Sequence, residues 1–165
     1  MSLSEIMTIL ILFHQSQMKT FTDFYLRIVQ VHYHSYFPNL LSYNRFLEWV
    51  PRTLLPFYGL FLMTRGQCTG FSFIDSMPIK VCHPIRSKRN KVFKGFSLAH
   101  SGKSSMGWFF GFNLHVIINH IGEIVDLVLS AGNVHDIKMV EPLSKNVFGY
   151  LFGNKGYLSK SKAKK

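Results

Sequence analysis

The chain has 165 residues, of which 47% are hydrophobic and 15% aromatic, and its formal net charge is +11. This composition is typical of a folded protein with a buried core and excludes an intrinsically disordered chain. The length allows one medium domain, or a small domain followed by part of a second.

The first predicted elements are helices. Ser2 and Glu5 have the spacing of a capping box, in which a serine N-cap is paired with a glutamate three residues later. Apolar residues follow at helical spacing and recur in the same way from Thr20 to Phe37, where Pro38 is expected to end a second helix. The pattern therefore predicts one helix after Ser2 and another over residues 20–37.

A third helical region follows. It is expected to begin at Ser42, and Pro51 and Pro56 are expected to divide it into two short helices. Residues 1–65 are therefore predicted to form a helical N-terminal region. Two interpretations of this region stay open, namely a helix-turn-helix unit that binds DNA and a packed helical bundle with no role in recognition.

The pattern changes from helical to β-prone after Arg65. Two apolar segments separated by a turn at 119–122 predict a β-hairpin, and Asp136 is expected to cap the helix that follows the hairpin. The predicted elements are, in order, strands over 70–74, 108–119 and 123–129, a helix over 136–146 and a strand over 150–152.

This order of strands and helix is the opening of a ribonuclease-H-like fold. We therefore predict an α/β protein in which the helical region 1–65 precedes a mixed sheet with flanking helices over residues 66–165. Several folds begin with a similar order, so the order alone does not assign a function. The sequence contains no internal repeat and no phosphate-binding glycine loop.

Basic residues are concentrated in one stretch of the chain. No acidic residue occurs from Ser76 to Gly122. Such a block favours a polyanionic partner, most simply nucleic acid, although a solvated basic loop has the same composition. The segment 160–165 is either an electrostatic arm or a disordered end. The basic residues of the block are Lys80, Arg86, Lys88, Arg89, Lys91, Lys94 and Lys103.

Cysteine content and apolar runs indicate the compartment. Cys68 and Cys82 are too few for a disulfide framework, and the adjacent Cys82 and His83 lack the spacing of a zinc site. The apolar run over 6–13 is too short to cross a bilayer, and the N-terminus lacks the basic start of a secretory signal. We therefore expect a cytoplasmic protein with no membrane partner.

Asp75 is the first candidate for chemistry. It follows the apolar segment 71–74, and a carboxylate at a strand edge can hold Mg²⁺ or Mn²⁺, which prefer oxygen ligands. Two such ions can activate a water or a 3′-hydroxyl at a phosphodiester, but several carboxylates are needed to neutralise them. The other carboxylates form no obvious cluster in the sequence, so a structural role for Asp75 is the alternative.

Six segments of the chain carry a recognisable family pattern. The most specific are Gly-Trp-Phe-Phe-Gly-Phe-Asn-Leu-His over 107–115 and Phe-Gly-Asn-Lys-Gly-Tyr over 152–157. In order and spacing, the segments resemble the DDE transposases of bacterial insertion sequences, and the resemblance covers nearly the whole chain. The supporting segments are 73–76, 82–83, 91–95 and 131–136, together with helical starts at 2–6 and 42–46.

The resemblance implies a ribonuclease-H-like catalytic domain that cuts and joins DNA at insertion-sequence ends with two Mg²⁺ or Mn²⁺ ions. The metal ligands of the family are Asp, Asp and Glu. The first corresponds to Asp75, and the second corresponds to the position that Asn154 occupies here. The third is a Glu downstream of the Gly-x-Lys-Gly-Tyr box, and the sequence ends at Lys165 before reaching it. Lys155, inside that box, joins the candidate nucleic-acid contacts.

These departures predict a truncated copy of a bacterial transposase whose catalytic domain over 66–165 is incomplete. An asparagine oxygen can coordinate a cation but brings no negative charge, and the affinity for hard metals depends strongly on carboxylate charge. The expected partner is DNA, and family members act as oligomers. Two alternatives stay open: a non-catalytic DNA-binding or interfering protein that uses the basic block, and a standalone metal-dependent nuclease of the same fold.

Overall fold

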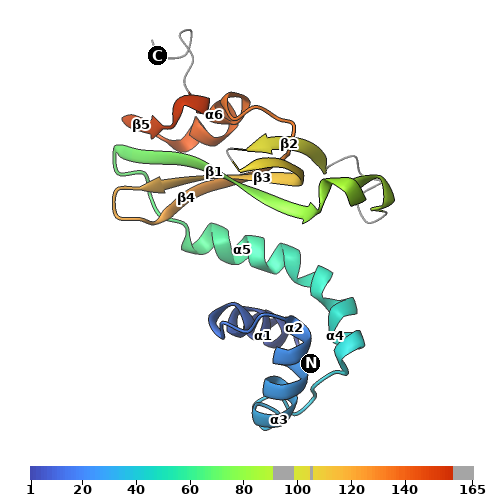
Figure 1. Cartoon of the computed structure of the whole chain (residues 1–165). Helices are drawn as coiled ribbons and strands as arrows, with labels where there is room; N and C mark the ends of the chain where they lie inside the picture. Colours follow the sequence, from blue (N-terminus) through green and yellow to red (C-terminus); the bar gives the residue numbers. More distant parts are fainter. Residues whose placement is uncertain (91–98, 105, 158–165) are drawn as a thin grey trace. The chain divides into compact units, whose positions relative to one another are not determined.

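The computed structural model describes residues 1–90, 99–104 and 106–157 (Figure 1). The chain divides into two compact units, a helical unit (Met1–Thr64) and a sheet unit (Arg65–Lys165). The strands that the structure describes all belong to the sheet unit. Within the described ranges, no helix combines the length and the apolar character needed to cross a membrane.

The helical unit begins with the expected capping box. The Ser2 hydroxyl accepts a hydrogen bond from the backbone N–H of Glu5 at 3.2 Å, and the Glu5 carboxylate accepts one from the backbone N–H of Ser2. These bonds satisfy donors that would otherwise lack partners at the helix start. The helical segments are α1 (Leu3–Gln15), α2 (Phe21–Asp23), the π-helix η1 (Phe24–Val29), α3 (Gln30–His32), α4 (Tyr43–Trp49), the 3-10 helix η2 (Val50–Thr53) and α5 (Leu54–Thr64).

Two helix boundaries differ from the sequence prediction. The second helical run ends at His32 rather than at Phe37, because residues 33–37 turn and the Phe37 side chain enters the core. Pro56 lies in the first turn of α5, where a proline removes no intrahelical hydrogen bond, so the interruption falls near Pro51 instead. The buried core of the helical unit consists of Ile6, Ile9, Phe24, Tyr25, Val29, Phe37 and Phe46.

The sheet unit contains a mixed sheet. β3 pairs antiparallel with β1 along one edge, while β2 and β4 pair antiparallel with successive parts of it. β1 pairs parallel with β5. The strands are β1 (Phe71–Cys82), β2 (His100–Ser104), β3 (Gly107–Asn119), β4 (Ile124–Ala131) and β5 (Tyr150–Gly153). The helices are η3 (Pro84–Arg89), α6 (Ile137–Leu143), η4 (Ser144–Asn146) and η5 (Lys155–Tyr157).

The strand order confirms the predicted fold class. The β3–β4 hairpin lies beside β1, and the fourth predicted strand, β5, returns parallel to β1 after α6. A helical region followed by a mixed sheet with flanking helices is the expected α/β arrangement, in the strand order of a ribonuclease-H-like sheet. This order places the C-terminal end of β5 beside the N-terminal part of β1.

The two faces of the sheet have different surroundings. α6 lies on one face (Figure 1), and the buried core of the unit is on that side. Because side chains alternate along a strand, Phe71, Phe73 and Asp75 of β1 are exposed while Ser72 and Ile74 between them are buried. The core consists of Ile74, Ile117, Val125, Leu143 and Tyr157.

Two parts of the sheet were missed by the sequence prediction. β1 continues past Ile74 to Cys82, because its pairing with β3 extends that far despite an irregularity between Lys80 and Cys82. β2, which is a polar segment with little apolar signal, is a strand because it pairs with the start of β3. Both errors arise because long-range pairing decides the strand and local propensity does not.

Candidate functional site

Asp75 and Asn154 are neighbours in space although their sequence positions differ by 79. The parallel register places Ile74 of β1 opposite Gly153 of β5. The next residues along the two strands are therefore adjacent, and the Asn154 side-chain nitrogen donates a hydrogen bond to Asp75 Oδ1 at 3.2 Å. The structure thus brings together Asp75 and Asn154, the two residues that the sequence analysis predicts as candidate metal ligands.

A tight turn fixes the Asn154 side chain. The side-chain amide oxygen of Asn154 accepts a hydrogen bond from the Gly156 N–H at 3.0 Å. The backbone carbonyl oxygen of Asn154 accepts one from the Tyr157 N–H, also at 3.0 Å. A Cβ atom on Gly156 would lie 2.8 Å from Asp136 Oδ2 and 3.2 Å from the Asn154 amide oxygen. A larger residue there would displace one of these groups, so the second glycine of the box has a local structural role.

Tyr157 anchors this turn to the core. Its side chain is 6% exposed, and its hydroxyl is hydrogen-bonded to His115 Nδ1 at 2.9 Å. The other ring nitrogen of His115 is bonded to the Ser130 hydroxyl at 2.8 Å, so both nitrogens of this fully buried ring have partners. Burial lowers the pKa of His115 and raises the pKa of Tyr157 to about 12. At neutral pH the link between the two side chains is therefore uncharged.

Asp136 joins the site instead of capping α6. It occupies the N-cap position, but its side chain makes no capping hydrogen bond, which corrects the sequence prediction. Asp136 Oδ1 accepts a hydrogen bond from the Ser76 hydroxyl at 3.4 Å and lies 3.9 Å from His115 Nδ1. This role has only a weak signal in the sequence, because an aspartate before a helix is usually a cap. Ser76, His115 and Asp136 are thus site neighbours that sequence reasoning missed.

The side chains around Asp75 of β1 and Asn154, which follows β5, do not fit a pair of divalent cations. Among the described residues, no three His, Cys, Asp or Glu side chains are arranged to hold a metal ion. At the Asn154 position, an N–H group faces the Asp75 carboxylate, and the amide oxygen is occupied by a backbone N–H. An amide oxygen can coordinate Mg²⁺ or Mn²⁺ but supplies no negative charge, and the affinity for these ions depends strongly on carboxylate charge.

The candidate nucleic-acid contacts are exposed, and they occupy two places. Lys155 directly follows Asn154 on η5, whereas the others that the structure describes lie on β1, η3 and β2. Lys80 lies five positions after Asp75 on β1, which is about 17 Å at the rise of a strand. Lys91 and Lys94 lie outside the described residues. The described contacts of the second group are Lys80, Arg86, Lys88, Arg89 and Lys103.

Within residues 1–90, 99–104 and 106–157, no acidic side chain forms an ion pair with these basic side chains. The ion pairs that the described residues form involve Arg27, Arg45 and His115 on the basic side, and none involves the candidate contacts. A pocket of about 470 Å³ lies beside them, lined by Lys80, His83 and the two aromatic residues Trp108 and Phe109 among others. An exposed, unpaired basic group of this kind attracts a polyanion.

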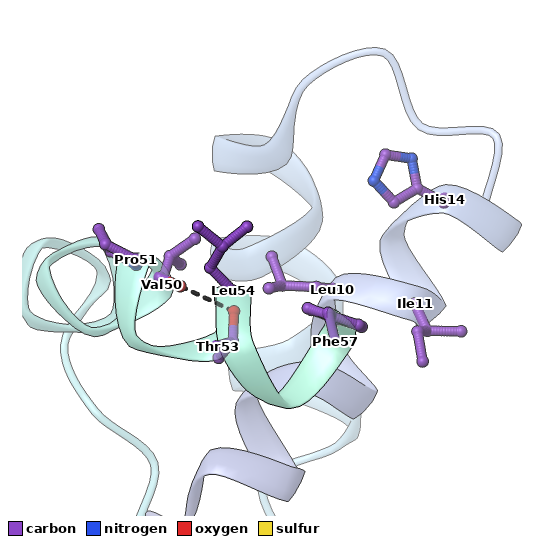
Figure 2. Close-up of a pocket in the computed structure, with 8 residues that line it drawn as sticks. All are labelled: Leu10, Ile11, His14, Val50, Pro51, Thr53, Leu54 and Phe57. Carbon is purple, nitrogen blue, oxygen red and sulfur yellow. Dashed lines mark hydrogen bonds between the residues drawn. The ribbon is translucent and has the colours of Figure 1, made fainter. Parts of the chain in front are cut away.

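A separate pocket of about 560 Å³ lies within the helical unit (Figure 2). The Thr53 hydroxyl points to the carbonyl oxygen of Val50 and donates a hydrogen bond to it at 2.7 Å, so it is not free for a ligand. His14 is the one ionisable side chain in the lining. A pocket without converging polar groups has no catalytic arrangement. The lining consists of Leu10, Ile11, His14, Val50, Pro51, Thr53, Leu54 and Phe57.

The substitution Tyr157→Phe tests the anchor of the Asn154 turn. It removes the hydroxyl partner of the buried His115 ring, and a buried polar atom left without a partner costs about 1–3 kcal/mol. We expect the free energy of unfolding, measured with urea, to fall by that amount. The control Tyr150→Phe removes a hydroxyl from an exposed side chain and should change the free energy by less than about 0.5 kcal/mol. Equal losses in the two variants would contradict the anchoring role.

Comparison with known proteins gives one match. The family described as "Transposase DDE domain" matches residues 65–165, which is the whole sheet unit. No curated protein and no solved structure matches the chain.

Proposed function

The chain belongs to the transposase DDE domain family, and we propose that it binds DNA without completing the metal-dependent cutting and joining of strands. The observation that carries this proposal is the hydrogen bond from the Asn154 amide nitrogen to the Asp75 carboxylate. The Asn154 N–H group lies beside the Asp75 carboxylate, at the place where a second carboxylate could bind a cation together with Asp75. Strand transfer by this family depends on such shared cations.

Both polar ends of the Asn154 amide are already in use. Its nitrogen donates to Asp75, and its oxygen accepts from the backbone N–H of Gly156. A cation between Asp75 and Asn154 would have to break the first bond and compete with the second, while gaining no negative charge from the amide. Phosphoryl transfer requires correctly placed metal ions, so this arrangement supports an inactive site.

The distribution of charge supports DNA as the partner. The net charge is +11, and the exposed lysines and arginines on β1, η3 and β2 form no ion pair with any residue that the structure describes. Contacts from such side chains to phosphates supply sequence-independent affinity. We propose that the sheet unit is the DDE domain and that the helical region 1–65 is an additional DNA-binding segment. The proposed DNA is that of insertion-sequence ends, and the proposed location is the bacterial cytoplasm.

A combined binding and cleavage assay tests the proposal. The full chain is incubated with labelled duplex DNA carrying insertion-sequence ends, in the presence of Mg²⁺ or Mn²⁺. We expect binding that weakens as salt is raised, and no strand cleavage. Cleavage that disappears in the Asp75→Asn variant would show a working metal site and overturn the inactivity. Binding no tighter than that of a neutral control protein would overturn the role in DNA binding.

A further inference from the structure

Four exposed aromatic side chains form a platform on the face of the sheet opposite α6. Phe71 and Phe73 come from β1, and Tyr150 and Phe152 come from β5. The parallel register pairs Phe71 with Tyr150 and Phe73 with Phe152, and both pairs are stacked, with ring centroids 5.7 and 5.5 Å apart. The four side chains are between 46% and 67% exposed.

The aromatic platform is continuous with the candidate site. Asp75 follows Phe73 by two residues on β1, and Asn154 follows Phe152 by two residues at the end of β5. Because side chains alternate along a strand, Asp75 lies on the same face of β1 as the two phenylalanines. The exposed Lys155 comes next in the chain. A ligand bound on the platform would therefore reach Asp75, Asn154 and the positively charged side chain of Lys155.

The chemistry of the platform favours unpaired nucleotides. Exposed aromatic rings on a sheet can stack with bases whose faces are free, which is the case in single strands and not inside a duplex. The cross-strand stacking holds the rings in place, so little side-chain freedom is lost on binding. An apolar protein surface could also cover these rings, but the net charge of +11 and the neighbouring Lys155 complement a polyanion.

We propose that this platform binds the bases of unpaired nucleotides in DNA and holds them beside Asp75 and Asn154. The inference rests on the proposed DNA-binding function and adds a class of ligand to it, namely single-stranded or locally opened DNA. The phosphates of the same strand are then placed near Lys155.

A double variant that carries both Phe73→Leu and Phe152→Leu tests the platform. Leucine keeps the face apolar but removes the aromatic surface of the pair closest to the site. Binding is measured by fluorescence anisotropy at low salt, with a labelled oligothymidylate and with a labelled duplex hairpin of equal charge. We expect the affinity for the oligothymidylate to fall by about fivefold to about a hundredfold, and the affinity for the hairpin to stay within about twofold.

The control Phe148→Leu removes an exposed ring that lies outside the two stacked pairs, and it should leave both affinities unchanged. Thermal unfolding of each variant checks that the fold is retained. Equal losses for both DNAs, or no loss, would overturn the platform. Hairpin binding by the original protein without oligothymidylate binding would overturn the platform alone, and binding to neither DNA would overturn the proposed function as well. Sedimentation measures self-association of the original protein and of the leucine variant. If both self-associate equally strongly and the variant has no specific loss of affinity for oligothymidylate, the platform is an apolar protein interface instead.

Discussion

Substitution of Arg86, Lys88 and Arg89 by glutamine is expected to weaken binding to duplex DNA and to flatten its dependence on salt. The three side chains are exposed and lie on η3. Each phosphate contact contributes about 0.9 to the slope of log K against log salt concentration, so losing three should reduce the slope by about 2.7. When salt is lowered from about 200 to about 50 mM, the affinity of the triple variant for DNA should therefore rise by a factor roughly 40-fold smaller than that of the original protein.

The matched control removes the same charge elsewhere. Lys19, Lys138 and Lys145 are exposed and lie outside the basic block, and their replacement by glutamine lowers the net charge equally. Anisotropy titrations of both triple variants over a range of salt concentrations give the two slopes. A slope that changes equally in both variants would mean that only the total charge of the protein matters, which would contradict a local interface at η3.

Asn154→Asp is expected to create a response to divalent cations that the original protein lacks. The substitution replaces an amide that donates to Asp75 by a second carboxylate at the same place, and two carboxylates can share a cation. With Mg²⁺ at about tenfold over its dissociation constant, the gain in the free energy of unfolding should be about 1.4 kcal/mol. Without Mg²⁺, the variant should be less stable than the original protein, because two negative charges then face each other.

Thermal unfolding with EDTA, Mg²⁺ and Mn²⁺ measures this response. The control Asn146→Asp adds an acidic group at an exposed position in η4, so it reports any general effect of added charge. The same stabilisation by Mg²⁺ in the original protein and in Asn154→Asp would contradict our interpretation of the amide.

The parts of the fold that could be predicted from the sequence are those with local signals. The Ser2–Glu5 capping box and the β3–β4 hairpin have short-range patterns, and both were found in the expected places. The proximity of Asp75 and Asn154 could be expected only from the family resemblance. It depends on the parallel pairing of β1 with β5, which no local pattern specifies.

The parts that could not be predicted depend on contacts between distant segments. The hydroxyl of Tyr157 meets His115 across 42 residues of sequence, and neither residue has a local feature that indicates the other. Asp136 was expected to cap α6, since its position before a helix gives that signal, but the neighbouring Ser76 hydroxyl supplies a different partner. Tertiary contacts thus override local preference at the residues that surround the site.

The insertion of Tyr157 into the core has a consequence for the motion of the site. The Asn154 turn is closed by two short-range hydrogen bonds, but its end is held by a ring that packs with Ile74 and Ile117. Turns on a surface commonly open on their own, at a small fraction of the global unfolding free energy. This turn cannot detach without exposing the buried ring and histidine, so its opening belongs to the same cooperative unit as the centre of the sheet.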